Sequence, residues 1–111
     1  MAVGTAVGDL SATIKRLHKG KQEHWEEGKA EGRKDGEQWA RDKADYHSLI
    51  QVCEGADLIW ETLRELAGCD YEEVRAVADV GGHEPDAFCD GYFEGFTEGA
   101  QSIWNQVKGK I

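Results

Sequence analysis

Apolar positions recur at helical spacing along most of the chain, and no segment shows the strict alternation that is typical of a strand. The clearest stripe predicts a helix that begins near Asp45 or Ser48 and ends at Gly68. Its apolar members are Leu49, Val52, Cys53, Ala56, Ile59, Trp60, Leu63 and Leu66. Because the period continues through residues 53–60 without a break, we expect one uninterrupted helix here.

Local start and stop signals predict the other elements. Asp70 and Glu73 have the spacing of a capping box, and Pro85 is typical of a helix start. The predicted segments are a flexible arm at 1–8, a helix from Asp9 or Ser11 to 19, and helices at 21–43, 70–80 and 85–108. Within helix 70–80, Val74, Val77 and Ala78 should face inward. The sequence therefore predicts an all-α fold, a single compact bundle of four to five helices over residues 9–111.

An internal repeat links two of the predicted helices. Residues 27–38 and 90–101 both follow the pattern [DE]GxxEGxx[DE]GxQ, with copies 63 residues apart. The repeated glycines are Gly28, Gly32 and Gly36 in the first copy and Gly91, Gly95 and Gly99 in the second. Each glycine inside a helix costs about 0.5–1 kcal/mol relative to alanine, so a compensating interaction is expected.

Glycines at four-residue spacing form a groove that lets another backbone approach closely. The otherwise polar helix 21–43 offers only this groove for burial, together with Trp25 and Trp39 on the same stripe. We therefore expect it to pack against helix 85–108 through a seam of glycines. The sequence leaves open whether this pairing forms within one chain or between the two chains of a homodimer.

Charge is distributed unevenly over a chain whose formal net charge is −9. Residues 1–43 hold 9 bases and 8 acids, whereas residues 44–111 hold 4 bases and 14 acids. Such a surface repels nucleic acid, whose phosphates require lysine and arginine. Its natural complement is a protein partner with a basic surface, including one that belongs to a nucleic-acid-binding complex.

The second copy of the repeat supplies the candidate binding surface. No base occurs between Arg75 and Lys108, so its acids lack compensation in sequence. The predicted surface consists of the acids Asp90, Glu94 and Glu98 with the aromatic anchors Tyr92, Phe93 and Phe96. The preferred hypothesis is a non-catalytic acidic protein that blocks or scaffolds a basic partner. Its most concrete form is a nucleic-acid mimic that inhibits a DNA- or RNA-handling machine, such as a phage anti-defence or anti-CRISPR protein.

Two alternatives remain open. The run Glu54-Gly-Ala-Asp57-Leu-Ile-Trp60 resembles the ExxD helix of the all-α nucleoside-triphosphate pyrophosphohydrolases of the MazG type, and Cys69-Asp70-Tyr71 resembles the turn that follows it. That resemblance implies a Mg²⁺-dependent hydrolase in which Glu54 and Asp57 hold the metal. Two carboxylates three residues apart on a helix also suit a hard cation. The other alternative is a structural adaptor in a hetero-complex.

Other chemistry finds little support in the sequence. The three cysteines lack a CxxC pair and are expected to be buried and reduced, which together with the absence of a signal-peptide pattern favours a cytoplasmic protein. No run of residues is apolar enough for a membrane span. His18, His24, His47 and His83 do not cluster by spacing, so no histidine metal site, and no cofactor, is expected.

Overall fold

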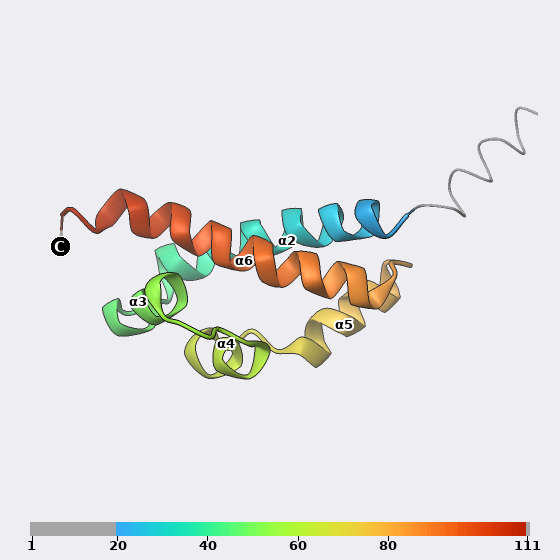
Figure 1. Cartoon of the computed structure of the whole chain (residues 1–111), viewed down its shortest axis with the longest axis horizontal. Helices are drawn as coiled ribbons and strands as arrows, with labels where there is room; N and C mark the ends of the chain where they lie inside the picture. Colours follow the sequence, from blue (N-terminus) through green and yellow to red (C-terminus); the bar gives the residue numbers. More distant parts are fainter. Residues whose placement is uncertain (1–19, 111) are drawn as a thin grey trace, which may run out of the picture.

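The computed structural model describes residues 20–110, and within them the chain is all-α with five helices and no strand (Figure 1). The helices are α2 (Lys21–Asp42), α3 (Tyr46–Glu54), α4 (Trp60–Ala67), α5 (Tyr71–Val80) and α6 (Pro85–Val107). The predicted fold class is therefore confirmed. The predicted arm and first helix, at 1–8 and up to 19, lie outside the described residues.

The two long helices α2 and α6 lie side by side and run in the same direction (Figure 1). Their parallel course follows from the contacts: Gly28 faces Phe88, whereas Gly36, further along α2, faces Phe96 further along α6. Two parallel helices cannot be joined by a short loop, because the chain must first return from the end of one to the start of the other. Here α3, α4 and α5 carry the chain back along the other side of α6.

The six repeat glycines are the positions at which the two backbones meet. A Cβ atom at Gly32 would lie 2.8 Å from the carbonyl carbon of Tyr92 and closer still to its oxygen. A Cβ atom at Gly95 would meet the Lys29 carbonyl group in the same way. No side chain fits at such positions, because the obstacle is helix backbone rather than a movable side chain.

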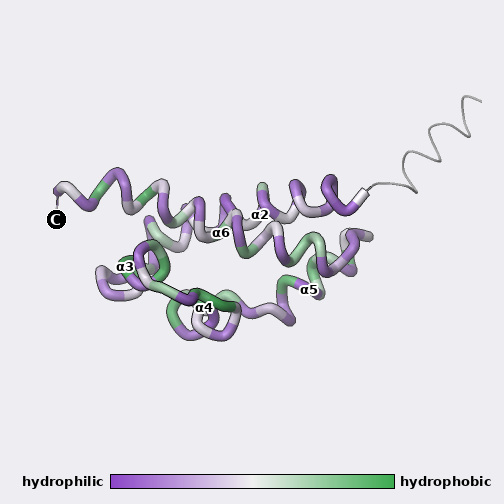
Figure 2. Tube along the Cα trace, viewed as in Figure 1, coloured by the Kyte–Doolittle hydropathy of each residue, from purple (hydrophilic) through white to green (hydrophobic). Residues whose placement is uncertain are grey.

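The hydrophobic core lies between α6 and the returning helices. Figure 2 shows α2 as mostly hydrophilic, whereas hydrophobic residues gather on α3, α4, α5 and α6. The bulkiest fully buried side chains are those of Phe88, Leu63 and Cys89. At the end of α2, Trp39 is buried against Phe96, with ring centroids 5.6 Å apart. Helix α6 is thus the central element and packs against α2, α3 and α5.

The prediction of a single helix from Asp45 or Ser48 to Gly68 is wrong. Helix α3 ends at Glu54 and α4 begins only at Trp60, and between them Asp57 adopts a left-handed backbone with φ of 58°. Ile59, which the stripe places inside, is 55% exposed. The apolar period continued across the break because α3 and α4 each bury a face of their own.

Two finer expectations on α5 are also wrong. Val77 is 61% exposed, while Val74 and Ala78 are buried, so the inward face is narrower than predicted. Asp70 precedes the helix but its side chain accepts no capping hydrogen bond. The capping box occurs instead at the start of α3, where the Asp45 carboxylate accepts from the Ser48 amide at 2.7 Å.

Candidate functional site

The predicted acidic surface on α6 is less uniform than the sequence indicated. Asp90 and Glu94 are exposed. Glu98, however, lies 3.3 Å from the Lys29 ammonium and 4.0 Å from the Arg33 guanidinium, both on α2. The inference that this column of acids lacks compensation is therefore wrong at its last member, because the neighbouring helix supplies the bases.

The three aromatic residues assigned to that surface face the interior instead. Phe96 is only 3% exposed and belongs to the core, so the prediction that it is an accessible anchor is wrong. Phe93 is half-buried against Trp60, with ring centroids 5.2 Å apart, and Tyr92 stacks on the same indole at 6.4 Å. These rings join α6 to α4, which accounts for their spacing along α6.

An acidic pocket of about 310 Å³ lies on the same side of the molecule as these rings. Its apolar and aromatic lining includes Val74, Val77, Phe88, Tyr92 and Phe96. Four carboxylates surround it, those of Glu31 and Asp35 on α2, Asp70 before α5 and Glu73 on α5. No lysine, arginine or histidine is among the residues that line this acidic pocket.

Hydrogen bonding fixes one wall of the acidic pocket. The Tyr92 hydroxyl donates to the Asp35 carboxylate and links α6 to α2. Burial and the neighbouring carboxylate both raise the pKa of Tyr92 well above its ordinary value, so the hydroxyl remains a donor at neutral pH. Burial likewise raises the pKa of the Cys69 thiol in this wall to about 12, which argues against a thiolate nucleophile there.

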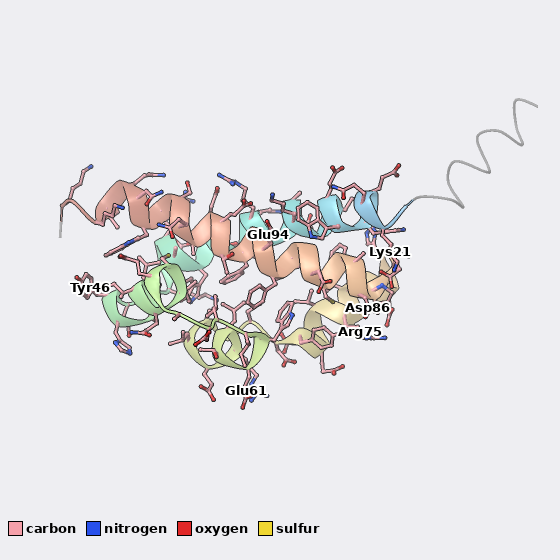
Figure 3. All side chains as sticks on the ribbon, viewed as in Figure 1. Lys21, Tyr46, Glu61, Arg75, Asp86 and Glu94 are labelled. Carbon is pink, nitrogen blue, oxygen red and sulfur yellow. The ribbon has the colours of Figure 1, made fainter. Side chains whose placement is uncertain are left out.

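The packing of α2 against α6 determines which carboxylates form ion pairs with nearby bases. On α2, Lys29 and Arg33 turn toward α6, and Arg33 also lies 3.3 Å from Glu37. Glu31 and Asp35, on another face of α2, form no ion pair with any described lysine or arginine. Elsewhere, Arg75 on α5 lies 3.6 Å from the Asp86 carboxylate on α6 (Figure 3). Glu31, Asp35, Asp70 and Glu73 therefore line the acidic pocket without an ion pair to any described lysine or arginine, a site that sequence reasoning missed.

The carboxylate pair of the hydrolase alternative does not form the arrangement that the resemblance implies. Glu54 is the last residue of α3, and Asp57 lies in the connection to α4 with its positive φ. The expectation that Glu54 and Asp57 share one helix face is therefore wrong. The same family also has an upstream EExxE helix, which Glu23 and Glu26 match only in part, and both of these residues lie exposed on α2.

Two histidines that are distant in sequence do meet, contrary to expectation. Nδ1 of His24 lies 3.2 Å from Nδ1 of His83, and the latter atom lies 2.8 Å from a carboxylate oxygen of Glu27. His47 is exposed on α3, and His18 lies outside the described residues. No spacing rule could find this cluster, because the parallel register of α2 and α6 brings together residues 59 positions apart.

The comparisons with known proteins add no relative to this picture. No helix in residues 20–110 combines the length and apolar character needed to cross a bilayer. No family model, curated protein or solved structure matches the chain.

Proposed function

We propose that this chain is a non-catalytic binding protein that docks a basic protein partner at the acidic pocket and thereby blocks or scaffolds it. One observation carries the proposal: four carboxylates line a pocket together with apolar and aromatic side chains, and no basic residue lines it. Solubility alone does not require acidic side chains to be grouped around apolar ones. The close pair of α2 and α6 serves as the scaffold that holds two of these acids in place.

The chemistry of the acidic pocket fits a lysine or arginine side chain. Such a side chain buries its aliphatic stem along apolar surface and keeps its charged head at the polar edge. Here Phe88 and Val77 would contact the stem, and Glu31 or Glu73 would accept charge-assisted hydrogen bonds from the head. The excess of acids beyond the pocket would accelerate the encounter with a basic surface.

The concrete form of the proposal is mimicry of nucleic acid. Successive acids at four-residue spacing rise about 6 Å along a helix and would stand in for phosphates. Glu31 and Asp35 are two such acids on α2, and both border the acidic pocket. A partner that normally holds DNA or RNA presents the complementary lysines and arginines.

The proposal is tested by capture of a partner from the source cell with matched charge reversals. The pocket variant carries Glu31→Lys and Glu73→Lys, both at exposed positions. The control variant carries Glu23→Lys and Glu26→Lys on α2 away from the pocket, with the same change in net charge. We expect the wild type and the control to retain one basic partner at about 0.15 M salt, and the pocket variant to lose it.

Two outcomes contradict parts of the proposal. Equal retention by both variants, with circular dichroism showing that each is folded, would show that the pocket acids do not contact the partner. Mimicry is tested separately by adding duplex DNA or RNA to the captured complex. A nucleic acid that fails to release the partner at any concentration would overturn mimicry and leave only a pocket for a basic protein.

A further inference from the structure

Three metal-binding side chains converge on one side of α2. His24 and Glu27 lie one turn apart on α2, and His83 lies in the connection between α5 and α6. One ligand atom from each residue lies within 4.8 Å of those from the other two. We call these residues the His24–Glu27–His83 cluster.

The hydrogen bonds of the cluster share a single atom. Nδ1 of His83 lies 2.8 Å from Oε2 of Glu27 and 3.2 Å from Nδ1 of His24. When His83 Nδ1 carries a proton, it donates to the Glu27 carboxylate, and His24 Nδ1 then presents its lone pair to the same hydrogen. One possible ligand atom from each of the two rings and the carboxylate thus already lies within one small region.

We propose that the His24–Glu27–His83 cluster binds a divalent transition-metal ion of the Zn²⁺ class. Two imidazoles with one carboxylate favour zinc and its neighbours over magnesium or calcium, which prefer oxygen ligands alone. Tetrahedral zinc holds nitrogen ligands at about 2.0–2.1 Å, which places neighbouring ligand atoms about 3.3 Å apart. The observed separations of 2.8 and 3.2 Å therefore need little adjustment.

The surroundings hold the ligands in place and leave one side accessible. The His83 ring stacks on Phe88, with centroids 4.7 Å apart and 22° between the planes. A Cβ atom at Gly81 would lie 2.9 Å from the same ring, so a larger residue there would require the ring to move. A cavity of about 410 Å³ borders both Glu27 and His83 and offers space for a water molecule as fourth ligand.

Titration of the metal-free 111-residue chain tests the site with Zn²⁺ and Co²⁺ alone as probes. We expect one ion per chain with a dissociation constant in the micromolar range or tighter, and a higher melting temperature in its presence. His83→Gln should weaken binding at least about tenfold, because it removes a direct ligand. His47→Gln, at an exposed histidine on α3, should leave the affinity unchanged.

Further readouts separate this site from other metal ligands and from misfolding. His24 is only 8% exposed, so Glu27→Gln, at a more exposed position, provides a second variant that should fold and should also bind more weakly. The Co²⁺ spectrum should lack a thiolate charge-transfer band, since the cysteines take no part. No binding by the wild type, or wild-type affinity in folded His83→Gln and Glu27→Gln, would overturn the proposal.

Discussion

Gly32 of α2 lies so close to Tyr92 of α6 that a Cβ atom at position 32 would stand 2.8 Å from the Tyr92 carbonyl carbon. The equivalent glycine of the other copy, Gly95, stands in the same relation to Lys29, also at 2.8 Å. Tyr92 lies three positions before Gly95, which is the repeat equivalent of Gly32, and Lys29 lies three positions before Gly32. The two helices are thus related by an approximate two-fold axis that runs along the pair, and each copy of the repeat provides the surface that the other needs.

Replacing one seam glycine by alanine should therefore destabilise the protein more than helix propensity would suggest. Alanine is the better helix former by about 0.5–1 kcal/mol, so propensity alone predicts stabilisation. The backbone obstacle at Gly32 instead forces the helices apart, and overpacking of this kind costs about 1–3 kcal/mol or more. Urea unfolding of Gly32→Ala and Gly95→Ala measures the loss.

Gly109 provides the matched control for this prediction. A Cβ atom there would meet no other atom within 4 Å, so Gly109→Ala should leave the unfolding midpoint nearly unchanged. If the two seam variants unfold at the same urea concentration as Gly109→Ala, the helices do not pack as closely as described.

The stability of the protein should fall in acid partly through two helix caps. Hydrogen bonds from backbone amides lower the pKa of Asp45 below its usual 3.8 and that of Glu84 below its usual 4.5. A lowered pKa in the folded state contributes stability above the unfolded pKa, and this contribution is lost as the pH falls through the folded value. We expect the urea midpoint to fall between about pH 5 and pH 2.

Isosteric amides identify how much of this acid dependence comes from the caps. Asn at position 45 still accepts a capping hydrogen bond but does not titrate, so Asp45→Asn with Glu84→Gln should flatten the pH profile. The control is Glu65→Gln with Glu94→Gln, at exposed carboxylates that cap no helix. Equal flattening in both pairs would mean that the caps are not the cause.

The three cysteines should react slowly with a thiol reagent in the folded protein. Burial raises the pKa of Cys53 and Cys89 to about 11 and that of Cys69 to about 12, so few thiolates exist near pH 8. Only Cys53 is partly exposed, and it should react first. Release of thionitrobenzoate from Ellman's reagent measures this, with three rapid equivalents expected in denaturant. A rapid equivalent from the native protein would indicate an activated cysteine.

The helix boundaries that the sequence predicted best are those with strong local signals. The predictions of 21–43 and 85–108 match α2 and α6 to within a residue, because Gly20 and Pro85 mark their starts and the polar ends are clear. The break between α3 and α4 was missed for a physical reason. The apolar period indicates which residues can be buried. It does not indicate that the backbone turns at Asp57, so that the apolar face of α4 points in a different direction from that of α3.

The candidate sites depended on tertiary structure more strongly than the helices did. The unequal charge of the chain directed attention to the acids of α6. Only the packing of α2 on α6, however, determines that Glu98 is paired, whereas Glu31 forms no ion pair with a described lysine or arginine. Likewise, His24 and His83 meet because the chain returns to the start of α2 before α6 begins. Spacing along a helix carries no information of that kind.

The parallel course of α2 and α6 also constrains how the chain can fold. Contacts between these helices join residues far apart in sequence, such as Asp35 and Tyr92, which are 57 positions apart. An antiparallel pair can grow outward from a short loop, but here α3, α4 and α5 must first reverse the chain. The entropy of closing that long loop is lost before the glycines make contact, so α2 should dock late and the protein should fold slowly for an all-helical chain of its length.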